Sequence, residues 1–143
     1  MSYEILKPVV VLAAWSMVMW IWMYAKRLPA MKKAGLLDEP MIGGTGATLG
    51  PKLPATVQWK ADNYNHLMEQ PTVFYAVALS LAFLGAGDSL NAIIAWAYVG
   101  LRIVHSLVQV TVNRVTIRFA LFLLSGICLL TLTVHAVAIV FTR

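Results

Sequence analysis

The sequence predicts an all-α integral membrane protein, built as a bundle of four transmembrane helices, and three observations lead to this fold class. Hydrophobic residues make up 60% of the 143 residues and only 12% are charged, whereas soluble domains average about 45–50% apolar and about 25% charged residues. The mean hydropathy is +0.77. The apolar residues also gather in four stretches, each close to the ~20 residues that cross a hydrocarbon core as a helix. This composition excludes a disordered tail, and the single cysteine, Cys128, excludes an intrachain disulfide.

Helices are favoured over strands because strict alternation of apolar and polar residues is absent, and only helices or closed barrels satisfy every backbone group in lipid. In a signal peptide the positive charges come before the apolar segment, but here the basic cluster that begins at Lys26 follows the first stretch, and no small-residue cleavage site is present. The first stretch is therefore expected to remain as a helix. The second begins in the polar segment ADNYNHLMEQP. We expect a single domain over 1–143, with helices at about 9–25, 63–87, 91–110 and 117–141.

The distribution of basic residues predicts the orientation in the membrane. An even number of helices leaves both termini on one side, where Lys7 and Arg143 lie. Most other Lys and Arg residues lie in the long loop at about 26–60 or just before the fourth helix. By the positive-inside rule these segments face the cytoplasm of an inner or plasma membrane, and both termini are non-cytoplasmic. Topology thus explains much of the net charge of +5, and no nucleic-acid partner is expected.

A second pattern is a set of polar residues toward the cytoplasmic ends of the helices. Charged residues at membrane depth usually face the bundle and pair, and Glu69 with Arg102 is the obvious pair. Taken alone, this pair indicates a structural ion pair that links two helices. The whole set indicates instead a cationic pocket, because its arginines outnumber its one acid. Such surplus positive charge would suit a carboxylate or a thiolate. The set comprises Asn65, His66, Glu69, Arg102, His105, Gln109, Arg114 and Arg118.

The histidines leave a minor alternative open. His66 is expected at the membrane surface, where a solvated imidazole is the simpler interpretation. His135 lies 16 residues into the fourth helix, about 25 Å from its cytoplasmic end at ~1.5 Å per residue. It is therefore too distant to share a haem with His105. His66 and His105 share a depth, so a haem- or quinone-binding membrane protein remains a minor alternative. No metal site is expected.

The four helices, the basic first loop, the segments NHLMEQPTVF and GLRIVHS and the arginines of NRVTIRF resemble bacterial-type members of the MAPEG family, membrane-associated proteins of eicosanoid and glutathione metabolism. These motifs cover about residues 60–126. Arg102 with His105 and Arg114 with Arg118 match the family's RxxH and RxxxR spacings, and Glu69 matches its helix-two acid.

The resemblance implies a homotrimer of four-helix bundles in the lipid bilayer, with glutathione held as co-substrate between subunits near the cytoplasmic face. It implies that Arg118 is the catalytic arginine, which helps to hold and ionise the thiol. The thiolate would then attack a lipophilic electrophile or peroxide, as a transferase or peroxidase does. The glutathione-binding residues would be Glu69, Arg102, His105, Arg114, Asn65, His66 and Gln109.

Several positions depart from the pattern of glutathione-using members. His66 stands where Asn is usual and Gln109 where Tyr is common, while Phe119 and Phe122 replace residues with hydroxyl groups. Each change removes a polar contact, at ~0.5–1.5 kcal/mol per neutral hydrogen bond. These departures favour an alternative function, a non-catalytic membrane subunit that acts structurally or within a larger complex.

Overall fold

A computed structural model describes residues 1–142, in which long helices are joined by turns and by the longer 34–54 segment; Arg143, counted above on the non-cytoplasmic side, lies outside the described residues. No strand occurs in residues 1–142, so the predicted all-α class is confirmed. Three helices, α1, α5 and α6, are long and apolar enough to cross a membrane. The elements are α1 (Leu6–Lys33), α2 (Gly46–Leu49), η1 (Gly50–Lys52), α3 (Ala55–Leu67), α4 (Gln70–Phe83), α5 (Leu90–Thr111) and α6 (Val115–Thr142).

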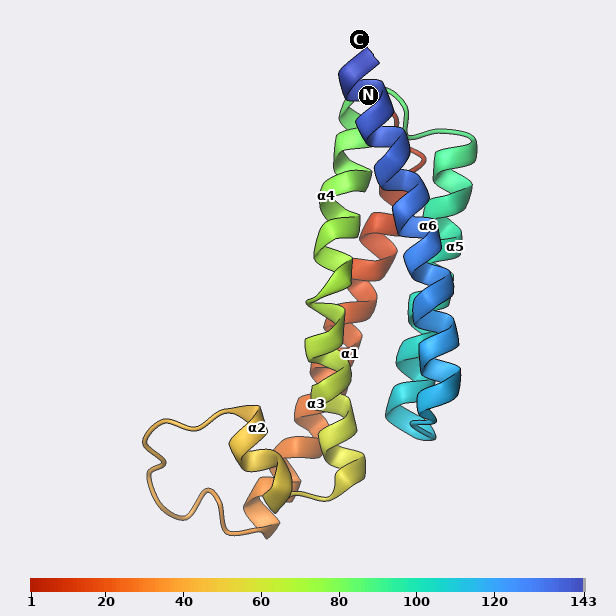
Figure 1. The fold of residues 1–143 in the computed structure, drawn as a ribbon. Coiled ribbons are helices and arrows are strands. Elements are labelled where there is room, and N and C mark those ends of the chain that lie inside the picture. The colour runs from red at the N-terminus through yellow and green to blue at the C-terminus, as the bar shows by residue number, and fades with distance from the viewer. Residues whose placement is uncertain (143) are drawn as a thin grey trace.

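The long helices run side by side and give the molecule two distinct ends (Figure 1). Both chain termini lie at one end, together with the 84–89 connection; we call this the termini end. The opposite end holds the 34–54 segment, including α2 and η1, and the 112–114 turn between α5 and α6; we call this the loop end.

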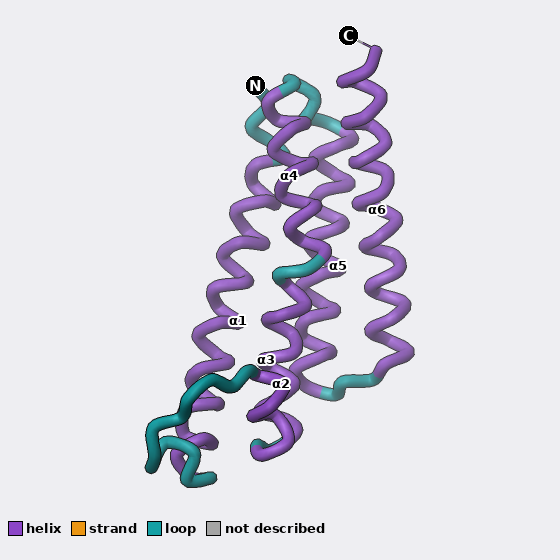
Figure 2. Tube along the Cα trace, turned by 60° about the vertical axis from the view of Figure 1, so that its left-hand side comes forward, coloured by secondary structure: helices purple, strands orange, loops and turns teal. Residues whose placement is uncertain are grey.

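The expected helix over 63–87 is not continuous, which corrects the sequence interpretation. It is divided into α3, of 13 residues, and α4, of 14 residues, and the two follow one another along one side of the bundle (Figure 2). Pro71 explains the break. Proline has no N–H to donate, and its ring clashes with the carbonyl four residues earlier, which belongs to Leu67, the last residue of α3.

The expected loop over 26–60 is also shorter than predicted. The helix expected over 9–25 continues to Lys33, and α3 already begins at Ala55. The reason is that α1 keeps burying one face beyond its first charges. The buried side chains recur at helical spacing from Leu12 through Ser16, Met19, Met23, Arg27 and Met31.

Helices α5 and α6 pack along their length and are joined by a tight turn. Asn113 in this turn has φ 49°, a conformation that Asn tolerates better than most residues. The predicted 91–110 and 117–141 compare with Leu90–Thr111 and Val115–Thr142 in the structure. The Tyr98 ring of α5 stacks on the Phe74 ring of α4, with centroids 4.5 Å apart.

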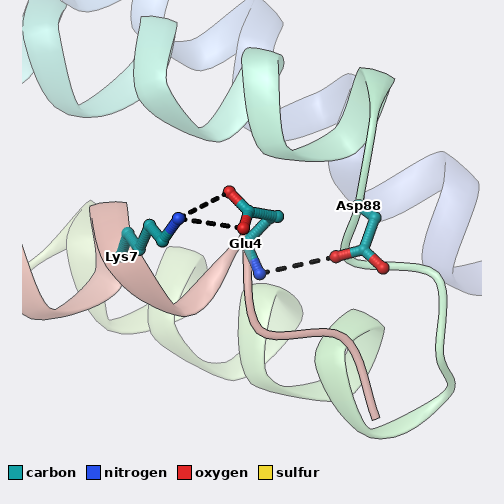
Figure 3. A network of polar contacts seen from close by, with 3 residues as sticks. All are labelled: Glu4, Lys7 and Asp88. Carbon is teal, nitrogen blue, oxygen red and sulfur yellow. Dashed lines mark hydrogen bonds and ion pairs between the residues drawn. The ribbon is translucent and has the colours of Figure 1, made fainter.

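The N-terminal segment closes the termini end of the bundle. The Glu4 backbone N–H donates to Asp88 Oδ1 at 3.4 Å, and Lys7 Nζ donates to the Glu4 carboxylate at 2.9 Å (Figure 3). The side chain of Ile5 is fully buried beside Gly87, where a Cβ atom would approach Ile5 Cγ2 to 2.4 Å. This end of the molecule is therefore tightly packed, without the polar surplus found toward the other end.

Candidate functional site

A cavity of about 180 Å³ lies between α3, α5 and the first turns of α6, toward the loop end. We call it the His–Arg cavity. It brings together polar side chains from three helices and apolar side chains of α6. Its lining residues are His66, His105, Val115, Arg118, Phe119 and Phe122.

His66 joins this cavity to the buried Arg102. Arg102 Nη2 lies 2.9 Å from His66 Nδ1 and also donates to the His66 carbonyl oxygen at 3.3 Å. Arg102 is 1% exposed, and His66 is half-buried. The expectation of a solvated imidazole at the membrane surface is therefore wrong. Because α3 ends one residue later, His66 occupies its last turn and faces α5.

Aromatic contacts hold the His66 ring on its other sides. The rings of His66 and His105 have centroids 4.9 Å apart, and the Phe122 ring meets the His66 ring edge to face at 5.6 Å. The Arg102 guanidinium lies 5.9 Å from the Phe122 centroid, within cation–π range. Since the two imidazoles are in contact, no porphyrin plane fits between them, and the haem alternative loses its geometric basis.

Arg118 enters the cavity from the first turn of α6. Its Nη1 donates to Asn113 Oδ1 at 2.6 Å, and its backbone N–H donates to the Arg114 carbonyl at 3.1 Å. The turn between α5 and α6 thus orients the guanidinium. Sequence reasoning missed Asn113, although an Asn between two helical stretches is a known turn signal.

Glu69 does not form the expected ion pair with Arg102. Among residues 1–142 the ion pair is Lys7 with Glu4, far from this site. Glu69 is exposed and stands in the break, as the residue before α4. The break that Pro71 imposes takes Glu69 off the helical face it would share with His66 and Asn65, so His66 contacts Arg102 instead.

The remaining candidate residues are placed around the cavity rather than in its lining. Arg114 is exposed just before α6, and Gln109 is buried on α5. Asn65 is exposed and faces a different cavity, next to Arg27 and Tyr24. The structure therefore gathers His66, Arg102, His105 and Arg118 and leaves the other four candidates outside this contact group.

Buried donors without partners give the site its chemical character. Within residues 1–142, Arg102 Nε, Arg102 Nη1 and Arg118 Nε are buried and have no hydrogen-bond partner. A buried polar group without a partner costs about 1–3 kcal/mol, and a charged group costs more. Arg118 lines the cavity, so its free guanidinium N–H fits an anion there, whereas Arg102 lies behind His66. No group of three or more His, Cys, Asp and Glu side chains in the described part of the chain is placed to hold a metal ion.

Comparisons with known proteins identify one family. The family model described as MAPEG family matches residues 5–138, nearly the whole chain. No curated protein and no solved structure matches significantly.

Proposed function

The chain belongs to the MAPEG family and is an integral membrane protein, and we propose that its His–Arg cavity binds glutathione or a related anionic thiol as co-substrate. The substrate class would be lipophilic electrophiles or peroxides that reach the cavity from the bilayer. The single observation that carries the proposal is Arg118, which lines the cavity and whose buried Nε–H has no hydrogen-bond partner within residues 1–142.

The charge around the cavity supports a thiolate over a thiol. Arg118 lines the cavity, and Arg102 lies behind His66, while Glu69 is exposed and makes no ion pair in residues 1–142. Positive charge near a thiol favours its ionised form. The thiol proton would pass to solvent, and the sulfur lone pair would then form a bond to an electrophilic carbon, whose leaving group departs with its electron pair. Arg118, the lining arginine, is the residue we propose to stabilise the sulfur anion.

The size of the cavity supports a site shared between subunits. Its volume of about 180 Å³ is below the ~300–1,000 Å³ of most ligand pockets. A tripeptide would therefore extend beyond one chain. We propose a homotrimer in which a neighbouring subunit completes the site. In it, α3 and α4 together form the remaining membrane crossing, the loop end faces the cytoplasm, and both termini face the other side.

Calorimetric titration of the purified protein with glutathione, up to millimolar ligand, tests the proposal. Native mass spectrometry of the same sample checks for the trimer. Arg118→Gln is expected to weaken binding about ten- to a hundredfold, as loss of a hydrogen bond from a charged group implies. Arg114→Gln is the matched control. It removes the same charge four residues earlier in the chain, from a side chain that is exposed and does not line the cavity. A wild-type trimer that binds no glutathione would overturn the proposal.

A second candidate function is a non-catalytic membrane subunit, and Phe122 is the observation that favours it. Its ring packs against His66 and under Arg102, and it offers no hydroxyl group to a ligand. Phe119 also lines the cavity, but it is 63% exposed. Phe122→Tyr distinguishes the two functions. If the wild type binds no glutathione and this variant does, the missing hydroxyl group at residue 122 accounts for the lost binding, and the non-catalytic function of the wild type is supported.

A further inference from the structure

The contact between Arg102 and His66 fixes where the imidazole proton lies. A guanidinium has five N–H donors and no acceptor. At 2.9 Å from Arg102 Nη2, His66 Nδ1 must therefore be the acceptor and must carry a lone pair. In a neutral imidazole the proton then lies on Nε2. The second bond, from the same Nη2 to the His66 carbonyl at 3.3 Å, ties the guanidinium to the same residue.

The charges that surround His66 favour this neutral form. Arg102 and His105 face it from α5, and Arg118 faces it from α6. The one acid that acts on it is Glu69, which is exposed in the turn after its own helix. A second cation beside two arginines is unfavourable. His66 is thus a neutral N–H donor rather than an imidazolium.

The two residues differ in their access to the cavity. Arg102 is 1% exposed and does not belong to the lining, whereas His66 does. The Nδ1 edge of the His66 ring is taken by Arg102, so the edge that carries Nε2 remains for a ligand. Arg102 therefore reaches the cavity through His66 rather than directly.

We propose that Arg102 and His66 form a donor relay, in which Arg102 fixes the Nε2–H tautomer of His66 and this N–H donates to the anionic sulfur or a carboxylate of the bound thiol. The inference rests on the proposed function. Arg102 is a positioning residue, and His66 is the residue that touches the ligand. An asparagine side chain and an Nε2–H imidazole both present an N–H donor, so the relay gives a physical reason for histidine at this position.

His135 provides an internal control with the opposite tautomer. Asn91 Nδ2 donates to the Ala86 carbonyl at 2.8 Å, so Asn91 Oδ1 is the atom turned toward His135. His135 Nδ1 lies 2.7 Å from this oxygen and must donate to it. His135 lies at the termini end, outside the His–Arg cavity. The two histidines thus differ at Nδ1, where His66 accepts a hydrogen bond and His135 donates one.

Nitrogen-15 NMR of histidine-labelled protein in detergent tests the first half of the relay without any ligand. His66→Asn and His135→Asn samples assign the signals. We expect His66 to show an Nε2–H neutral ring at neutral pH, and His135 an Nδ1–H ring. Arg102→Leu should convert His66 to a mixture of tautomers and leave the His135 signals unchanged, while Arg102→Lys should restore part of the preference. An Nδ1–H or doubly protonated His66 in the wild type would overturn the relay.

Glutathione titration of His66 variants tests the second half. His66→Asn, which keeps an N–H donor, should bind within a few-fold of the wild type. His66→Leu should bind at least about tenfold more weakly, as expected for a lost hydrogen bond to an anion. Wild-type binding that His66→Leu leaves unchanged overturns the relay while the proposed function stands. A wild type that binds no glutathione overturns the proposed function and the donation step, whatever the NMR result.

Discussion

At the scale of single residues, the partner of one buried arginine decides the chemistry of the site. The spacing of Tyr98, Arg102 and His105 places them on one face of α5, and they are buried there. The spacing does not reveal which residue of α3 meets Arg102. A helix ending at Leu67 makes that residue His66 and leaves Glu69 exposed.

Replacement of Glu69 tests this change of partner. Glu69→Gln should change the free energy of unfolding by no more than about 0.5 kcal/mol, because an exposed carboxylate without an ion pair contributes little. His66→Leu should destabilise the protein by about 1–3 kcal/mol, since it leaves a buried guanidinium N–H without its acceptor. Melting temperatures in the same detergent compare the two. A loss for Glu69→Gln as large as that for His66→Leu would show that Glu69 does pair with Arg102.

Asn113 has two separable roles at the same scale. Its φ of 49° allows the turn, and its Oδ1 orients Arg118. Asn113→Gly should keep the melting temperature close to that of the wild type, because glycine accepts this conformation, yet weaken glutathione binding several-fold. Asn113→Val should lower the melting temperature, because a β-branched residue at positive φ costs about 1–2 kcal/mol. Equal binding by Asn113→Gly and wild type would show that the turn does not orient the arginine.

At the scale of elements, helix ends were harder to foresee than helix cores. The face of α1 continues through Arg27 and Met31, so a boundary placed at the first charges ends the helix about two turns too early. Long basic side chains can bury their stems along apolar surface, and charge alone does not end a helix. Pro71, in contrast, breaks the second predicted helix, because it removes a donor and clashes with the preceding turn.

The packing of the N-terminal segment on the 84–89 connection gives a test of element docking. Gly87→Ala would bring a Cβ to 2.4 Å from Ile5 Cγ2 and 3.2 Å from Ala82 Cα. Overpacking of this kind costs about 1–3 kcal/mol. Gly100→Ala is the matched control, because nothing lies within 4 Å of its Cβ, and alanine is favoured over glycine inside a helix by about 1 kcal/mol. The two variants should therefore shift the melting temperature in opposite directions; a shared direction would contradict the observed docking.

At the scale of the whole molecule, the two ends of the bundle differ in polarity and packing. The polar cavity lies toward the loop end, whereas the termini end is closed by Ile5 against Gly87 and by the contact of Glu4 with Asp88. Both termini share one end in Figure 1, which is the arrangement that an even number of crossings requires. Which end faces the cytoplasm stays a prediction from the positive-inside rule.

Labelling of single cysteines tests that orientation. Cys128 is the one native cysteine, so Cys128→Ser gives a cysteine-free background. Ile42→Cys, in the exposed loop-end segment, should react with a membrane-impermeant maleimide only from the cytoplasmic side. Asp88→Cys, at the termini end, should react only from the opposite side. The reverse pattern would invert the topology, and labelling of both from one side would contradict the arrangement of the crossings.

The all-α class, the membrane environment and the family follow from the amino-acid sequence alone, because hydropathy and motif spacing are local properties that do not depend on packing. The sequence also supplied every titratable residue of the cavity. Which of these residues contact one another depends on how the helices pack. The break at Pro71, the continuation of α1 to Lys33 and the Asn113 turn set the rotation and depth of each helix. A contact between helices depends on both, so Arg102 meets His66 rather than Glu69, and no spacing along the chain carries that information.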